Sequence, residues 1–278
     1  MKLRRLRMGL ATVLGIAPQG FFIPYRYAGR LPGPGARPVY AALEALLDRE
    51  VAAFEALLEQ IDGHADDLNA IGGAAPPAPR WDQDWFPPLD AAALYALIRG
   101  RRPARVVEIG SGHSTRFAAR AVTDGGLGTT ITAIDPRPRA ALAGLDIDLR
   151  RATLAEAGDK PFRDLAAGDL LLVDSSHVAM PGSDVDDVLA RILPLLPAGV
   201  AVQFHDIFLP DDYPADWAWR GYNEQTAVAA LLSAGGWRPL FASHYVTTRM
   251  PARLAVSAVA GLPHKPGARA ASLWLEKR

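Results

Sequence analysis

The sequence predicts an α/β protein: a doubly wound, mostly parallel sheet closed by a C-terminal antiparallel hairpin, preceded by an N-terminal helical cap. Two observations carry this prediction. From residue 104 onward, short apolar strands alternate with helical patterns, as in a parallel sheet covered on both faces. The last two apolar segments, 237–246 and 271–277, read instead as strands with no helix between them. We expect residues 1–89 to form the cap and residues 90–278 the α/β domain.

The first residues read as a basic amphipathic helix. Its apolar face would be formed by Leu3, Leu6, Leu10 and Val13. Residues 1–20 also have the shape of a short signal peptide, but no A-x-A cleavage pattern follows them. We therefore expect a retained helix that packs on the domain or makes peripheral contact with a membrane surface.

A longer helix is expected over residues 38–70, where apolar residues recur at helical spacing. Asp90 stands where the N-cap of another helix, running through Ile98, is expected. Strands are then predicted at 105–109, 130–134, 147–152, 169–174 and 199–205. The helices between and after them are predicted at 114–123, 137–143, 184–195 and 223–234.

A Gly-rich turn follows the first strand in the sequence Glu108-Ile-Gly110-Ser-Gly112. The two glycines permit a tight turn and a close approach of the backbone to a ligand. Asp135 ends the next strand, at a spacing that suits an acid that binds ribose hydroxyls. The pattern is not the phosphate-binding G-x-G-x-x-G, because Thr115 takes the third glycine position. Glu108 would repel phosphate and suits a ligand with a positive amino group.

This turn resembles motif I of the class I S-adenosylmethionine-dependent methyltransferases, which have a Rossmann-like sheet. The resemblance covers residues 90–278, and the chain as a whole is similar to a bacterial family of class I methyltransferases without an assigned substrate. It implies S-adenosyl-L-methionine as cofactor. The residues that would hold this cofactor are Glu108, Gly110, Ser111, Gly112, Ser114, Asp135 and Asp174.

Polar residues also end the fourth and fifth strands: Asp174 and His177 after one, His205 and Asp206 after the other. Ligand sites in open α/β sheets lie at the carboxyl ends of the strands, so these four side chains should converge. Two carboxylates and two imidazoles in one pocket are costly unless they bind a cation or share protons.

The same rim has a distant similarity to the metal-dependent, catechol-type O-methyltransferases. Asp174, His205 and Asp206 fall on the positions of their metal ligands, and His177 on that of their lysine base. The resemblance implies a divalent metal on those three residues and catalytic roles for His177, His205 and Asp206. Histidine among the ligands would favour a softer metal than Mg²⁺. The alternative, which we favour, is a metal-free site in which a histidine deprotonates the acceptor.

The segment after the fifth strand is dense in aromatic and polar residues, and with Trp81 and Phe86 it would wall an acceptor pocket. The predicted substrate-binding residues are Trp85, Tyr213, Tyr222, Asn223 and Glu224. We expect methyl transfer to a small molecule, at a hydroxyl group. The alternatives are cyclisation of the cofactor or a metal-dependent hydroxylation on the same scaffold, and a non-catalytic cofactor-binding protein.

Composition limits the kinds of partner and of reactive site that this protein can have. Basic and acidic residues balance at 30 each, which argues against a nucleic-acid partner. The chain has no cysteine, so disulfides, thiolate metal sites and cysteine nucleophiles are excluded. We expect a cytoplasmic protein, with membrane association through residues 1–20 as the alternative; a homo-oligomer is compatible with the sequence.

Overall fold

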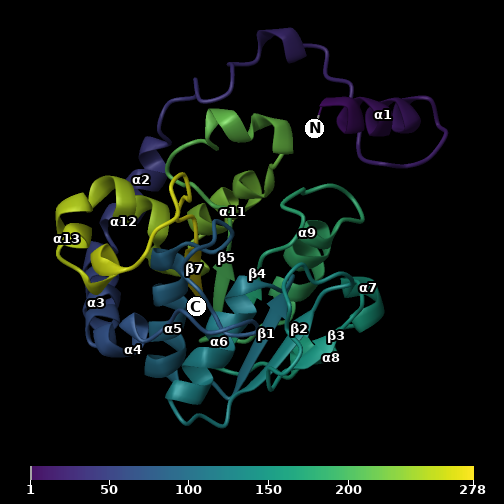
Figure 1. Ribbon diagram of the computed structural model, residues 1–278. Coiled ribbons are helices and arrows are strands. Elements are labelled where there is room, and N and C mark those ends of the chain that lie inside the picture. The colour runs from purple at the N-terminus through teal and green to yellow at the C-terminus, as the bar shows by residue number, and fades with distance from the viewer. Residues whose placement is uncertain (1) are drawn as a thin grey trace. The chain divides into compact units, whose positions relative to one another are not determined.

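The computed structural model describes residues 2–278 and divides them into two compact units, 1–37 and 38–278. The larger unit is built on one seven-stranded sheet, in the order β3-β2-β1-β4-β5-β7-β6. Its strands are β1 (Arg105–Ile109), β2 (Thr130–Ile134), β3 (Asp148–Arg150), β4 (Leu170–Val173), β5 (Ala201–Phe204), β6 (Trp237–Ala242) and β7 (Leu273–Lys277). Figure 1 shows them running through the middle of this unit.

The first five strands are parallel, and only β7 runs against its neighbours β5 and β6. The registers align the strand ends: Ile109 pairs with Val173, and Val173 with Phe204. The residues that follow β1, β4 and β5 therefore emerge side by side. The predicted doubly wound sheet with antiparallel C-terminal strands is confirmed, and β1 and β2 have the predicted bounds.

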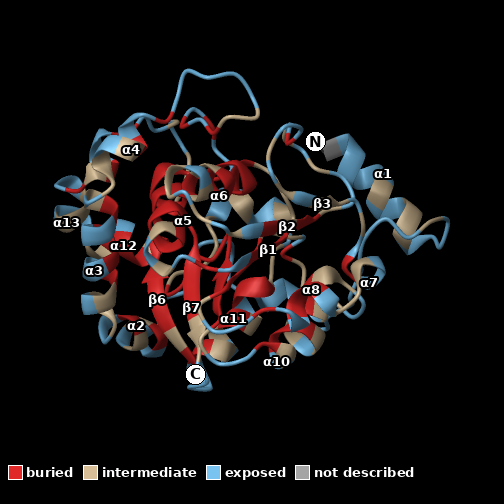
Figure 2. Cartoon of the chain, turned by 90° about the horizontal axis from the view of Figure 1, so that it is seen from below, coloured by how far each residue is buried: buried red, intermediate tan, exposed pale blue. Residues whose placement is uncertain are grey.

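Helices cover both faces of the sheet. α5 (Pro88–Arg101) and α6 (His113–Asp124) contact each other over one face, and α11 (Glu224–Ser233) lies over the other (Figure 2). On that second face the helical run 184–195 consists of α9 (Asp184–Asp186), the π-helix η2 (Asp187–Ile192) and α10 (Leu193–Leu195). Shorter helices are α7 (Leu154–Ala157), α8 (Lys160–Arg163) and the 3₁₀ segment η3 (Ala215–Arg220).

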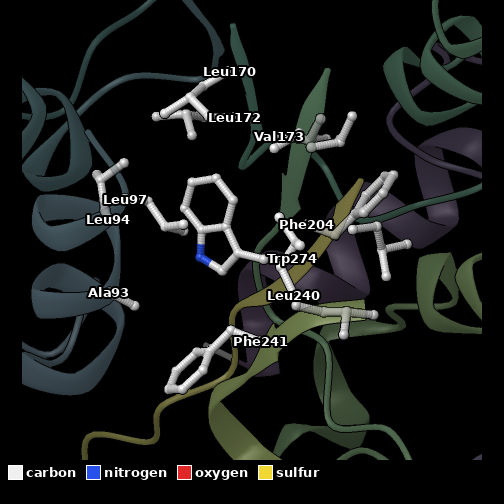
Figure 3. Packing of buried hydrophobic residues seen from close by; sticks show 14 of the residues in the cluster. Ala93, Leu94, Leu97, Leu170, Leu172, Val173, Phe204, Leu240, Phe241 and Trp274 are labelled. Atoms are coloured by element: carbon white, nitrogen blue, oxygen red, sulfur yellow. The ribbon is translucent and has the colours of Figure 1, made fainter. Parts of the chain in front are cut away.

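Trp274 on β7 anchors the core at the point where the sheet changes direction. Figure 3 shows its indole ring among Leu94 and Leu97 of α5, Leu172 of β4 and Phe204 of β5. The ring is fully buried, as are these neighbours apart from a small exposed fraction of Leu97 and Leu172. Burial of so many large side chains, each contributing about 1.5–3 kcal/mol, fixes the strand ends that carry the site.

Several predicted elements differ from the structure. Residues 38–70 form three helices, α2 (Ala41–Asp48), α3 (Val51–Asp62) and α4 (Ala65–Asn69), because α2 packs on α11 whereas α3 packs on α5 and β6. These helices belong to the larger unit, and the compact units divide after Arg37. The predicted boundary at residue 89 thus does not coincide with this division.

No helix forms at 137–143. Pro138 disfavours the α conformation at Arg137, and the Asp135 carboxylate accepts the N–H of Arg137 instead (2.7 Å). The prediction that no helix separates the last two strands is also wrong. α12 (Ser243–Arg249), α13 (Pro251–Ala255) and the 3₁₀ segment η4 (Ala258–Gly261) lie between them.

The smaller unit contains α1 (Lys2–Val13), which confirms the predicted N-terminal helix, and the 3₁₀ segment η1 (Ala28–Arg30). Among residues 2–278, no helix has both the length and the apolar character needed to cross a membrane.

Candidate functional site

Gly110 brings the turn after β1 against the end of β4. Its φ is +79°, a left-handed conformation that favours glycine. A Cβ built at this position would lie 1.9 Å from the carbonyl oxygen of Asp174. The close approach explains why the turn needs glycine here, and it joins the predicted cofactor residues to the predicted catalytic rim.

Glu108 lies beneath this turn and is fully buried. Its two carboxylate oxygens accept hydrogen bonds from the hydroxyls of Ser114 and Thr115, each at 2.5 Å. Burial raises its pKa to about 8, against the opposing effect of the two hydroxyl donors. The sequence predicted that Glu108 and Ser114 contact the cofactor; in the structure they bond to each other and hold the first turn of α6.

Asp135 organises the opposite side of the turn. One of its oxygens accepts both the N–H and the hydroxyl of Ser111 (2.9 and 3.0 Å), and the other accepts the N–H of Arg137. Each carboxylate oxygen can accept more than one hydrogen bond, so Asp135 retains capacity for a ligand hydroxyl. The predicted residues Ser111 and Asp135 thus lie together at the carboxyl ends of β1 and β2.

Gly112 borders open space: a Cβ built there meets no atom within 4 Å. Its N–H donates to the Thr115 hydroxyl at the start of α6. Beside it, the exposed Trp85 stacks on the ring of His113 at 5.5 Å. Gly112 and the Trp85–His113 stack, a group that we call the cradle, therefore lie at the start of α6, next to the hydrogen bond between Ser111 and Asp135.

The four residues predicted to converge beyond β4 and β5 do so. His177 Nε2 lies 3.3 Å from Asp174 Oδ1 and 3.6 Å from Asp206 Oδ2. His205 Nδ1 lies 3.5 Å from both Asp174 and Asp206. Both imidazoles and Asp206 are buried, whereas the side chain of Asp174 is 36 % exposed. Asp174 is thus the member of this rim that a substrate can reach.

Two further carboxylates complete the rim from outside. Glu224 of α11 lies 3.0 Å from His177 Nδ1, and Asp90 of α5 lies 3.5 Å from His205 Nε2. Glu224 was expected to contact substrate, but it is fully buried behind His177. Asp90 was expected as an N-cap, but it lies inside α5, where its carboxylate accepts the N–H groups of Ala271 and Ser272.

Sequence reasoning gave Asp90 no part in the site. A signal was present: it is a lone carboxylate in an otherwise apolar helix start, Pro-Pro-Leu-Asp-Ala-Ala-Ala-Leu. A carboxylate on a buried helix face needs a partner.

The neighbouring carboxylates favour the charged form of both imidazoles. Burial alone would lower the pKa of His177, but its contacts with Asp174 and Glu224 raise it well above 6.5. Burial would also lower the pKa of His205. The charges of Asp174 and Asp206 outweigh burial and raise this pKa well above 6.5. For Asp174, the neighbouring His205 and His177 overcome the effect of burial and lower its pKa.

The rim also holds backbone strain and unpaired polar atoms. His177 and Asp206 have φ values of +59° and +56°, in the region that non-glycine residues rarely occupy. Both ring nitrogens of His205 and Oε1 of Glu224 have no hydrogen-bond partner, although they are buried. Strain and unsatisfied groups of this kind concentrate at functional sites.

The remaining predicted substrate residues lie around the rim. The Tyr222 ring is 4.6 Å from that of His177, and Tyr213 lies against Tyr222 at 6.1 Å. Asn223 instead bonds to the backbone of Ala179, so its amide supports the loop after β4. Arg220 contributes a positive charge to the rim, 3.7 Å from Asp206 and over the Trp217 ring.

The metal ligands that the resemblance implies are Asp174, His205 and Asp206. In the structure, Nδ1 of His205 lies 3.5 Å from a carboxylate oxygen of each aspartate. Within residues 2–278, no group of three or more His, Asp or Glu side chains has an arrangement that could hold a metal ion.

Comparison with known proteins adds one match in sequence. A family model described as a methyltransferase domain matches residues 107–207, which contain the glycine turn and the rim. No curated protein matches the chain.

Similar solved structures include a Podospora anserina methyltransferase bound to S-adenosylhomocysteine (17 % identity, 79 % of this chain and 93 % of that one, TM-score 0.40). A Bacillus cereus O-methyltransferase, also with S-adenosylhomocysteine, is 11 % identical (80 % and 91 %, 0.39). The Streptomyces achromogenes O-methyltransferase TomG, in complex with S-adenosylmethionine, is 14 % identical (87 % and 99 %, 0.40).

Proposed function

We propose that this chain is a class I, S-adenosylmethionine-dependent methyltransferase that methylates a hydroxyl group of a small-molecule acceptor; the match of residues 107–207 to a methyltransferase domain supports this. The observation that carries this proposal is the rim itself. A reachable carboxylate, Asp174, touches a buried imidazole, His177, directly beside the glycine turn. A carboxylate in contact with an imidazole can bind a hydroxyl and take its proton.

The cofactor side has four parts. Asp135 would accept hydrogen bonds from ribose hydroxyls, and Gly110 and Gly112 would let the backbone approach the ligand. Glu108 would act from below, by holding Ser114 and the start of α6 in place. When bound, S-adenosyl-L-methionine supplies an electrophilic methyl group on a sulfonium centre.

The acceptor would enter at the exposed edge of Asp174, between Trp85 and Tyr222. Asp174 would accept the hydrogen bond of the acceptor hydroxyl and so orient its oxygen. Tyr222 packs on His177 and would shield the imidazole from water. The sequence-based interpretation placed Asp174 among the cofactor residues and the metal ligands, on the same rim that would position and deprotonate the hydroxyl.

The proton would pass from the acceptor hydroxyl through Asp174 to His177 Nε2, 3.3 Å away. Glu224 holds the other ring nitrogen, so the ring presents Nε2 toward the acceptor. His205 is enclosed by Asp90, Asp174 and Asp206 and would act by its charge on Asp174. Asp206 would balance the charge of both imidazoles. His177 must lose its proton before each turnover. The positive charge of the bound sulfonium cofactor would lower the pKa of His177 and so favour this loss.

The proposal is tested by calorimetric titration with S-adenosylhomocysteine, followed by product analysis of acceptors incubated with S-adenosylmethionine. We expect binding to the wild type and its loss in Gly112→Val, whose side chain would enter the cradle. Gly128→Val, at a second glycine whose Cβ meets no atom, is the matched control. Unchanged affinity in a folded Gly112→Val protein would overturn the cofactor site. Detection of a methylated amine, a cyclised cofactor or a hydroxylated product would overturn the proposed methylation of a hydroxyl group. It would leave the cofactor site and the fold assignment unaffected.

A further inference from the structure

The smaller unit, residues 1–37, differs from the rest of the chain in charge. It contains seven basic residues and no acidic one. The basic residues are Lys2, Arg4, Arg5, Arg7, Arg26, Arg30 and Arg37. Because the whole chain balances at 30 basic and 30 acidic residues, the larger unit carries the compensating negative charge. An anionic partner would therefore be attracted to residues 1–37 and repelled by the remainder.

Exposed apolar side chains concentrate in the same unit. Among the residues that the structure describes, twelve of the sixteen exposed large hydrophobic residues lie between residues 3 and 31. They are Leu3, Leu6, Leu10, Val13, Leu14, Ile16, Phe21, Phe22, Ile23, Tyr25, Tyr27 and Leu31. Figure 2 draws α1 in the colours of exposed and intermediate residues. Exposed large apolar side chains gathered in one segment are typical of a surface that binds a partner or a membrane.

Helix α1 separates these two kinds of residue. At 100° per residue, Leu3, Leu6 and Leu10 fall on one face, and Arg4 and Arg5 on the other. After the helix, the chain folds back, with the Gln19 N–H bonded to Thr12 and the Ile16 N–H to Ala11. The twelve residues of α1 extend about 18 Å, short of the roughly 30 Å hydrocarbon core of a bilayer. The helix is therefore suited to lie along a membrane surface.

The segment after α1 repeats this combination with aromatic residues. Phe21, Phe22 and Ile23 are exposed in succession. The guanidinium groups of Arg26 and Arg30 lie over the Tyr27 ring, at 5.7 and 5.9 Å. Amphipathic rings and long basic side chains favour the zone between lipid headgroups and acyl chains.

We propose that residues 2–31 form a docking surface for an anionic lipid bilayer, with the apolar side chains inserted among the lipids and the arginines on their headgroups. Anionic headgroups match the charge of the unit, and the acyl region matches its exposed leucines and phenylalanines. A nucleic acid would match the charge but would leave these apolar side chains in water. The surface is independent of the methyltransferase site and would bring the enzyme to membrane-bound or membrane-soluble acceptors.

The test is co-sedimentation of the full-length protein with vesicles of phosphatidylcholine alone or mixed with phosphatidylserine. We expect binding to the mixed vesicles that weakens as salt is added. Reversing the charge of Arg4 and Arg5 to Glu should lower the partition coefficient at least about tenfold. Leu6→Glu with Leu10→Glu should lower it by a similar factor, because the inserted face becomes charged.

Two matched controls keep the result specific. Val256→Glu alters an exposed apolar residue of the larger unit, and Arg151→Glu reverses an exposed charge there. Both should bind vesicles as the wild type does, and unchanged thermal unfolding would show that each variant is folded. Absence of binding to the mixed vesicles would overturn the proposal, as would equal binding by the Leu6/Leu10 variant. Binding to RNA that survives this apolar substitution, without binding to vesicles, would assign the basic residues to a nucleic acid instead.

Discussion

The glycine turn after β1 and the rim after β4 and β5 lie side by side but are built in opposite ways. At the turn, the Glu108 carboxylate is bonded to Ser114 and Thr115 of α6, the Asp135 carboxylate is bonded to Ser111, and the left-handed position is a glycine. In the rim, the left-handed positions are His177 and Asp206, and buried ring nitrogens have no hydrogen-bond partner. The carboxylates of the turn region thus all have hydrogen-bond donors, although Asp135 can accept more, whereas the rim contains buried ring nitrogens with no hydrogen-bond partner.

The contrast is sharpest at the contact between the two regions. Gly110→Ala would force a Cβ into the Asp174 carbonyl at a left-handed φ, so we expect a loss of at least about 3 kcal/mol of stability. Gly112→Ala, two residues on, has room for its Cβ and should retain the wild-type free energy of unfolding. Chemical denaturation of both variants measures the difference. Equal stabilities would show that the turn and the rim are not tightly joined.

Removal of one polar side chain should lower kcat when the side chain belongs to the rim and should weaken cofactor binding when it lies at the turn. His177→Ala should reduce kcat on the order of 100-fold or more, because the proton acceptor is lost, and should leave cofactor affinity intact. His244→Ala, which removes a histidine paired with Asp211, is the control. If His177→Ala changes only KM, the ring positions substrate and does not take the proton.

Asp135→Ala should produce the reverse pattern. Loss of its carboxylate removes the acceptor for ribose hydroxyls, so S-adenosylhomocysteine should bind more weakly by about 1.5–3 kcal/mol. Asp148→Ala, at an exposed carboxylate on β3, should bind normally. Calorimetry of the two variants measures this. An Asp135→Ala protein with wild-type affinity would remove Asp135 from the cofactor site.

The pH dependence distinguishes activity from stability. The pKa values of His177 and His205 are raised, so a histidine base becomes competent only as pH rises well above 6.5. A histidine with its ordinary pKa would lose activity below about pH 6.5, and the environment in the structure moves this limit upward. Stability should follow the opposite course. A raised pKa stabilises the folded state below 6.5, and this contribution is lost as pH rises through the folded-state pKa.

Parallel profiles of kcat/KM and of Tm against pH test this, with Glu224→Gln as the variant. Removing the charge of Glu224 should move the activity limit to lower pH, because that charge raises the pKa of His177. If activity falls at the same pH in Glu224→Gln as in the wild type, the proposed pairing of His177 with Glu224 is wrong.

The smallest expected effect concerns metal. In the metal-free mechanism, dialysis against a chelator should leave activity unchanged. Loss of activity that one added divalent metal restores would instead revive the alternative with Asp174, His205 and Asp206 as ligands.

The same contrast explains what the sequence could predict. The glycine turn and strands β1 and β2 depend on residues close together in the chain, so local pattern predicted them to the residue. The convergence of Asp174, His177, His205 and Asp206 followed from the rule that parallel strands end at one edge. The roles of Asp90 and Glu224 could not be predicted in this way. They reach the histidines from α5 and α11, through packing between segments far apart in sequence.

The backbone of His177 connects the rim to α11 in a way that can be observed without any assay of turnover. Its carbonyl accepts the N–H groups of Asn223 and Glu224 at the start of that helix, while its ring contacts the Glu224 carboxylate. The amide protons of residues 223 and 224 are therefore reporters of the imidazole. A ligand that reorients the ring alters their rate of exchange with deuterated solvent, and a ligand confined to the glycine turn leaves that rate unchanged.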